Sequence, residues 1–340
     1  MATLKDIAKH LGLSTTTVSR ALNDFPEVGR DTRELVQRTA QELGYHPNQS
    51  ARKLVTGKSG IVAMVIKAPP NRQIDPSFFE VMGGLSTKLA EKDIDLILHV
   101  TTDQDPIKPY QRLIDKQTVD GFILNAPLEN DPRIDFLRER KFPFVVHGRA
   151  GGEADYPYYD IDNYGIGYSA TTLLLDLGHQ QIGLLNGPLQ AAFAVERLRG
   201  YTDAMEARGL SPNPEFLRHL DIHQPQSAIN IAGELLERPK RPTALLCSSS
   251  LIAYSAVKVA KLEGIPIPQQ LSLIAHDDDL PFQSALLEPS LTVTRSPLRR
   301  ACGPLSEMIF KLLEGDDPAS LQQTEPVELV VRDSTGPAPS

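Results

Sequence analysis

The segment LKDIAKHLGLSTTTVSRALN, residues 4–23, decides the fold of the N-terminal part of the chain. Within residues 4–11, apolar side chains recur at the three- and four-residue spacing of one helix face. Gly12 suits the end of this helix, and Ser14 suits the N-cap of a second helix over residues 15–23. Two short helices joined by a glycine turn predict a helix-turn-helix.

The surrounding residues complete a small basic head. A third amphipathic run over residues 31–43 predicts a third helix, which ends at Gly44. Residues 1–60 carry nine Lys/Arg and six Asp/Glu, a net charge of +3, whereas the whole 340-residue chain has a formal charge of −8. The remainder of the chain is therefore acidic. Because basic segments attract phosphate, this asymmetry predicts that the head alone meets nucleic acid.

The second helix of the head is the expected DNA-reading helix, since the start of such a helix meets base edges in the major groove. Its hydroxyls can donate to or accept from bases, its threonine methyls can contact thymine, and Arg20 can reach a guanine or a phosphate. The predicted DNA contacts of this helix are Ser14, Thr15, Thr16, Thr17, Ser19, Arg20 and Asn23.

Beyond residue 60, short apolar runs alternate with amphipathic stretches. The predicted strands are residues 61–66, 94–100, 121–124, 144–146, 182–185, 244–247 and 271–275, and the predicted helices are 78–92, 166–177, 197–208, 227–236 and 252–263. Continuous apolar strands separated by helices indicate parallel sheets covered on both faces. The pattern predicts an α/β body of two doubly wound lobes, with a ligand cleft at the carboxyl ends of the strands.

Several motifs resemble the LacI/GalR family of bacterial transcription regulators. They are LKDIA at residues 4–8, TVSRALN at 17–23, GYHPN at 44–48, RLRGY at 197–201 and LSLIAHDD at 271–278. The resemblance covers residues 2 to about 330 and implies a body like the periplasmic binding proteins. The predicted domains are a helix-turn-helix head (1–46), a hinge helix and linker (47–60), a two-lobed effector-binding and dimerisation domain (61–334) and a disordered tail (335–340).

The resemblance also implies a role for the hinge. Residues 47–55 match a segment that folds into a helix on operator DNA beside the same segment of a dimer mate, and Leu54 matches a leucine wedged into the minor groove. The hinge residues predicted to contact DNA are Asn48, Ala51, Arg52 and Leu54. On this basis we expect a homodimer on a pseudo-palindromic operator, released when a small molecule enters the cleft.

The same resemblance places an effector site in the body. Arg197 matches an arginine that clamps ligand oxygens, and Asp277 matches an aspartate that accepts from sugar hydroxyls; a buried structural role is the alternative for both. Ser249 and Ser250 stand where the family usually has Asn-Asp, which leaves more room for a ligand. The predicted effector-binding residues are Phe78, Phe79, His147, Arg149, Asp162, Phe193, Arg197, Ser249, Ser250 and Asp277.

The remaining expectations come from absences. The sequence shows no signal peptide or membrane-spanning run, and its two cysteines, Cys247 and Cys302, lack CxxC spacing, so we expect a cytoplasmic protein that uses no membrane. The sequence contains no phosphate-cradling glycine motif and no His/Cys cluster with metal-ligand spacing, so we expect no cofactor and no metal. An enzyme is disfavoured because no Gly-x-Ser-x-Gly elbow is present. A transporter's solute-binding protein would instead need a signal peptide and would lack the head.

The identity of the effector stays open at this stage. A sugar is favoured, with an α-glucoside first, because residues 11–28 look like that branch of the family. A corepressor, such as a purine or a partner phosphoprotein, is the alternative.

Overall fold

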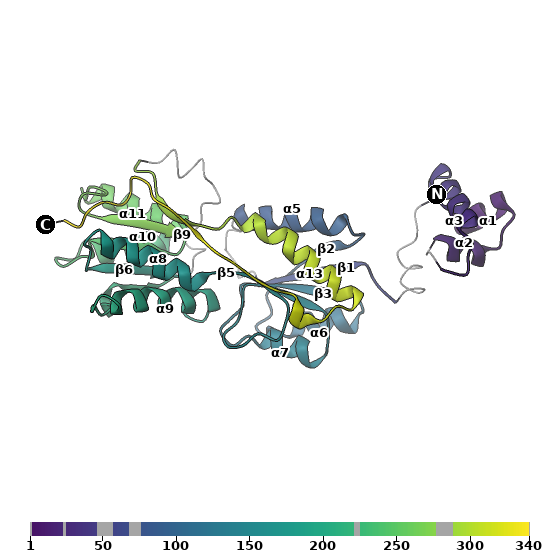
Figure 1. Ribbon diagram of the computed structural model, residues 1–340, viewed down its shortest axis with the longest axis horizontal. Coiled ribbons are helices and arrows are strands. Elements are labelled where there is room, and N and C mark those ends of the chain that lie inside the picture. The colour runs from purple at the N-terminus through teal and green to yellow at the C-terminus, as the bar shows by residue number, and fades with distance from the viewer. Residues whose placement is uncertain are drawn as a thin grey trace. The chain divides into compact units, whose positions relative to one another are not determined.

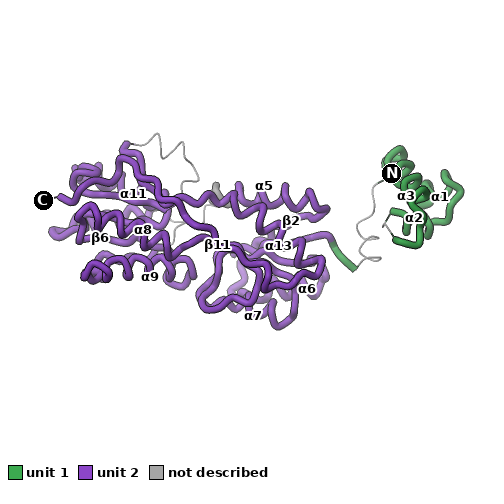
Figure 2. The backbone as a smooth tube through the Cα atoms, viewed as in Figure 1, with its two compact units in different colours: residues 1–59 green, residues 60–340 purple. Residues whose placement is uncertain are grey.

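The computed structural model describes residues 2–22, 25–45, 57–67, 76–220, 225–276 and 288–339, and the side chains at 76–78 and 225 are not described (Figure 1). The chain divides into two compact units, residues 1–59 and residues 60–340 (Figure 2). No helix of the described ranges is both long enough and apolar enough to cross a membrane.

The described part of the N-terminal unit holds three helices, α1 (Leu4–Leu11), α2 (Thr15–Leu22) and α3 (Arg30–Glu42). Helix α1 begins with a capping box, in which Thr3 N donates to Asp6 Oδ2 at 2.8 Å and Asp6 N donates to Thr3 Oγ1 at 3.4 Å. It ends at Gly12, whose φ of 66° is in the left-handed region. The three helices enclose one apolar core formed by Ile7, Ala8, Val18, Ala21, Val28, Val36 and Ala40.

The first lobe of the C-terminal unit is built on a parallel sheet of six described strands in the order β11-β5-β4-β3-β1-β2. Its strands are β1 (Ile61–Lys67), β2 (Asp95–Thr101), β3 (Gly121–Asn125), β4 (Phe144–His147), β5 (Tyr158–Ile161) and β11 (Gln322–Glu325). Its helices are α5 (Pro76–Ala90), α6 (Lys108–Asp115), α7 (Pro132–Glu139), α13 (Cys302–Glu314) and the 3-10 turns η2 (Leu298–Ala301) and η3 (Pro318–Ser320). Strand β1 shows why its apolar run is unbroken: Val62 packs under α5 and α13, whereas Ala63 packs on the opposite face with α6 and α7.

The second lobe has the order β12-β10-β9-β8-β6-β7, in which only the β10–β12 pair is antiparallel among the described strands. Its strands are β6 (Ile182–Asn186), β7 (Leu217–His219), β8 (Ala244–Cys247), β9 (Ser272–His276), β10 (Thr292–Arg295) and β12 (Glu328–Val330). Its helices are α8 (Asn163–Asp176), α9 (Ala192–Glu206), α10 (Pro225–Leu236), α11 (Ser250–Leu262) and the 3-10 turn η1 (Pro214–Phe216). One apolar cluster lies under α8 and α9, and another lies under α10 and α11. The two doubly wound lobes confirm the predicted fold class.

Helices α8 and α9 pack with their backbones in close contact. A Cβ atom on Gly167 would lie 2.1 Å from Arg197 O, and one on Gly200 would lie 2.1 Å from Tyr164 O. Glycine is therefore required on both helices at this crossing, which sets the position of α9 relative to the start of α8.

The C-terminal residues correct one prediction. Residues 335–339, expected to be disordered, are hydrogen-bonded to the second lobe. Gly336 N donates to Ser272 Oγ at 3.0 Å, and Ala338 N donates to Leu177 O at 2.8 Å. A tail rich in proline and small residues suggested disorder, but its backbone groups find fixed partners on the lobe.

Candidate effector pocket and DNA-reading helix

A cavity of about 210 Å³ lies where the two lobes meet. Its walls are at the carboxyl ends of β3, β4 and β5 of the first sheet and of β8, β9 and β10 of the second. This is the edge at which open parallel sheets bind ligands.

Arg197 of α9 is the central cation of the cavity, and it is only 6% exposed. Its Nε donates to Asn163 Oδ1 at 2.9 Å, and its NH1 donates to Ser248 O at 3.0 Å. Its guanidinium carbon lies 4.9 Å from the centroid of the Phe193 ring, one helical turn earlier. These contacts hold the guanidinium in a fixed direction at the cavity wall.

A chain of polar contacts runs from Arg197 into the first lobe. Asn163 Nδ2 donates to Asp160 Oδ1 at 3.2 Å, and Arg149 Nε lies 4.0 Å from Asp160 Oδ2. Burial raises the pKa of Asp160 to about 6, because the carboxylate loses more hydration than its neighbours replace. Asp160 lies on β5 of the first lobe and Asn163 begins α8 of the second, so these polar contacts link the two lobes at the segment that joins β5 to α8.

Two histidines of the cavity are uncharged near neutral pH. Burial lowers the pKa of His147 to about 4, and burial followed by nearby Arg197 lowers the pKa of His276 well below its ordinary value. His276 Nδ1 lies 3.0 Å from Thr294 Oγ1, within hydrogen-bonding distance.

Two polar atoms of the cavity are buried without a hydrogen-bond partner in the described part of the chain. They are His147 Nδ1 of the first lobe and Ser248 Oγ of the second. Because a buried polar atom without a partner costs free energy, these two atoms favour a ligand that brings hydroxyl groups to them.

Helix α2 presents a polar surface opposite its buried residues, Val18 and Ala21. The side chains of Thr15, Thr16 and Arg20 are exposed, as contact with DNA requires. The hydroxyl of Ser14 has a structural task as well.

Ser14 Oγ accepts a hydrogen bond from Thr17 N at 3.0 Å and lies 2.8 Å from Thr17 Oγ1. These two hydroxyls therefore fix the start of α2, and any contact that they make with DNA has to share this cap.

Comparisons with known proteins decide the family. Residues 3–48 match the family model described as bacterial regulatory proteins, lacI family, and residues 171–335 match a periplasmic binding protein-like domain. The HTH-type transcriptional regulator AglR of Rhizobium meliloti (strain 1021) is 39% identical to this chain, over 99% of this chain and 95% of its own. The chain belongs to the LacI family. It is a DNA-binding, ligand-responsive transcriptional regulator and not an enzyme.

Other relatives of this LacI-family chain support the same assignment. The HTH-type transcriptional regulator RafR of Escherichia coli is 32% identical over 94% of this chain and 95% of its own. Among solved structures, the complex of transcriptional regulator CelR with cellobiose has a TM-score of 0.72 at 27% identity, covering 98% of this chain and all of that one. The fold is shared with a lac repressor dimer bound to operator and the anti-inducer ONPF, over 98% of this chain and 99% of that one. The TM-score of this comparison is 0.81, and the sequence identity is 23%.

Half of the predicted effector residues of this LacI-family chain line the cavity. They are His147, Arg149, Phe193, Arg197 and Ser249. Ser249 is also the N-cap of α11, because its Oγ accepts from Ile252 N at 3.3 Å. Their part in ligand binding stays a prediction.

Three other predicted effector residues lie elsewhere. Asp162 Oδ1 accepts from Gly165 N at 2.7 Å, so its carboxylate caps α8, and the next residue, Asn163, lines the cavity instead. Phe79 is 58% exposed and does not line the cavity. Ser250 is the first residue of α11 and does not line the cavity, whereas Ser249, directly before it, does.

Several predictions fall on residues that the structure does not describe. Asp277 and the side chain of Phe78 lie outside the described effector body, and the predicted DNA contacts Asn23, Asn48, Ala51, Arg52 and Leu54 lie outside the described head.

Sequence reasoning missed seven polar residues of the cavity, namely Asn125, Tyr159, Asp160, Asn163, Ser248, His276 and Ser296. Asn125, Asp160, Ser248 and His276 lie within or directly after the last residues of strands, and three of these four follow apolar runs. The rule that ligands bind at the carboxyl ends of parallel strands, applied to each run in turn, would have found those three.

Proposed function

We propose that this regulator is a homodimeric repressor that a neutral sugar, with an α-glucoside as the first class to test, releases from a pseudo-palindromic operator. The observation that carries the proposal is a pair of atoms buried without a partner among the described residues, His147 Nδ1 and Ser248 Oγ, which belong to cavity-lining residues of opposite lobes. A hydroxyl both donates and accepts, so a polyol can satisfy both atoms.

The charges of the cavity favour a neutral ligand. Arg197 is already held by Asn163 and the Ser248 carbonyl, and Arg149 faces the Asp160 carboxyl. The histidines add no positive charge near pH 7. The cellobiose in the CelR complex supports a sugar as the ligand class, although that ligand belongs to the relative.

The size of the cavity suggests how binding and release are coupled. Its volume of about 210 Å³ is below the range of about 300–1,000 Å³ that is usual for ligand pockets. A disaccharide therefore needs the lobes to move as it binds, and such a movement is transmitted to the two hinges of the dimer. By linkage, operator DNA weakens sugar binding by the same factor as sugar weakens operator binding.

The first experiment is a thermal-shift panel on the full chain with maltose, sucrose and trehalose, and with cellobiose, hypoxanthine and glucose 6-phosphate for comparison. A ligand of the folded state raises the melting temperature by mass action. We expect an α-glucoside to give the largest shift. If hypoxanthine alone shifts the transition, the corepressor alternative replaces the sugar.

The second experiment is fluorescence anisotropy on an operator fragment selected from random DNA. The proposal requires the active sugar to lower operator affinity, and a tightening would identify a corepressor. Leu54→Ala should weaken operator binding and leave sugar affinity unchanged. Unchanged operator affinity in that variant would contradict the wedge.

A further inference from the structure

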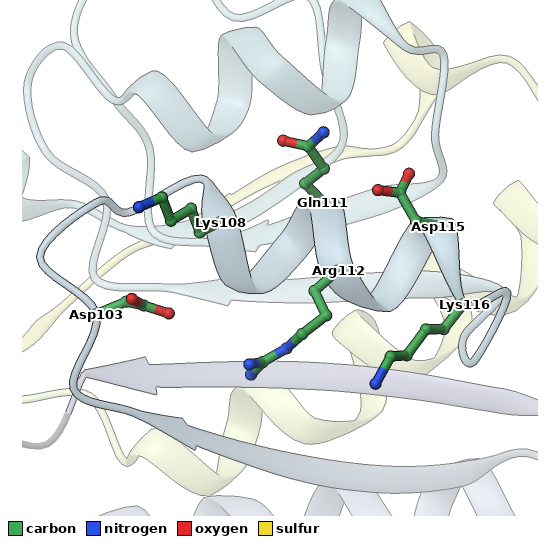
Figure 3. A pocket seen from close by; sticks show the side chains of 6 residues that line it. All are labelled: Asp103, Lys108, Gln111, Arg112, Asp115 and Lys116. Atoms are coloured by element: carbon green, nitrogen blue, oxygen red, sulfur yellow. The ribbon is translucent and has the colours of Figure 1, made fainter.

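A second, more open pocket lies in the first lobe, away from the effector cavity. It has a volume of about 470 Å³ and is lined by Asp103, Lys108, Gln111, Arg112, Asp115 and Lys116, none of which lines the effector cavity (Figure 3). The pocket is formed by α6 and the loop after β2, and β2 is the outer strand of the sheet.

Three cations recur at intervals of four residues, Lys108 and Arg112 within α6 and Lys116 at its C-cap. Residues at this spacing are neighbours on a helix surface, and eight residues correspond to about 12 Å along the axis. Figure 3 shows Arg112 and Lys116 extending toward the strands, whereas Gln111 and Asp115 point to the other side of the helix. No ion pair joins any of the three cations to a carboxylate within the described ranges.

His99 of β2 orients the middle cation without neutralising it. Its Nε2 lies 2.7 Å from Arg112 NH2. Burial and then the charge of Arg112 lower the pKa of His99, so the imidazole is neutral and accepts this hydrogen bond. The rest of the guanidinium keeps its full charge and its other N–H groups.

We propose that this groove binds an anion that carries two or more phosphoryl groups. A guanidinium can hold one phosphoryl group with two parallel hydrogen bonds, and a lysine on each side along the helix can hold a second. The lining residues carry three cations against two carboxylates, Asp103, which faces the same space, and Asp115, which points to the other side of the helix, so the groove keeps a net positive charge in a chain whose net charge is −8. No aromatic side chain of the described residues lines the groove, so the recognised group is the phosphate and not a nucleobase.

The test is calorimetric titration of the full chain with pyrophosphate at constant ionic strength, set with potassium chloride. We expect saturable binding at one site per chain, with inorganic phosphate at least tenfold weaker. Arg112→Gln should weaken pyrophosphate binding about tenfold or more, because a charged hydrogen-bonding group is lost. Asp103→Asn should strengthen it, because a repelling carboxylate is removed.

Lys261→Gln is the matched control, since it removes one exposed positive charge from α11 in the other lobe and should leave pyrophosphate affinity unchanged. Thermal unfolding and the response to the sugar panel report whether each variant is folded. The proposal is overturned if Arg112→Gln and Lys261→Gln behave alike, if Asp103→Asn weakens binding, or if phosphate and pyrophosphate bind equally well. None of these outcomes bears on the sugar cavity, which shares no residue with the groove.

Discussion

Replacing Ser248 with alanine should stabilise the protein and impair its response to sugar, two effects of opposite sign. Ser248 is 8% exposed, and its Oγ has no hydrogen-bond partner within the described residues. Its backbone carbonyl, which accepts from Arg197, is unchanged by the substitution. The change therefore removes one buried, unpaired hydroxyl and preserves the main contact of the site.

The magnitudes follow from the cost of burying a polar atom. An unpaired buried hydroxyl costs about 1–3 kcal/mol, and the small void left by its removal offsets part of that gain. We expect Ser248→Ala to raise the free energy of unfolding by about 1 kcal/mol, which for a unit of this size corresponds to a melting temperature higher by roughly 2 °C. Loss of a hydrogen bond to the ligand should weaken sugar affinity by about three- to tenfold.

Urea denaturation and calorimetric titration with the most active sugar of the panel measure the two effects. Thr171→Val is the matched control, because Thr171 Oγ1 is also buried without a partner but lies on α8 away from the cavity. It should raise stability and leave sugar affinity unchanged. A loss of stability in Ser248→Ala, or an unchanged affinity for the sugar, would refute the reasoning.

Three further predictions test the parts around the site. Gly167→Ala should lower the free energy of unfolding by about 3 kcal/mol in urea denaturation, because its Cβ would lie 2.1 Å from a carbonyl oxygen of α9. Gly233→Ala on α10 is the control: the nearest atom to its Cβ would be 3.5 Å away, so this variant should be neutral or stabilising. The pKa of Asp160, raised to about 6, makes the free energy of unfolding fall as pH rises from about 4 to 6, whereas the pKa of His147, lowered to about 4, makes it rise as pH rises from about 4 to 6.5. In denaturation measured at several pH values, Asp160→Asn should therefore make the free energy of unfolding rise more steeply with pH, and His147→Phe should make it rise less steeply. A chain that ends at residue 335 should melt at a lower temperature, since it loses the backbone hydrogen bonds of the tail, and an unchanged melting temperature would show that the tail contributes nothing.

The sequence predicted those elements whose signal is local. The apolar runs at β1 and β6 are buried on both faces, so their composition alone marks them as strands. Strand β11 has the sequence QQTE and is mostly exposed, and it is a strand because β5 pairs with it. Such a strand depends on a partner more than 160 residues away, which no local pattern encodes.

The effector site divides in the same way. The RLRGY motif singles out Arg197, and Phe193 follows from its position four residues before that arginine. Asp160 and Asn163 act together because the chain leaves one sheet between them and enters a helix of the other lobe. The motif at Asp162 and Asn163 located the start of a helix, but it did not show which of these two adjacent polar residues caps α8 and which lines the cavity.

The last strands of the chain have a consequence for its synthesis. Strand β11 completes the first sheet and β12 completes the second, and only two residues separate them. Although the first lobe begins at residue 60, it also requires α13 and β11, so it cannot finish folding on the ribosome before nearly all of the chain has emerged. A chain cut short before residue 322 therefore leaves both lobes incomplete, and the sensor completes its two sheets only after translation has passed residue 330.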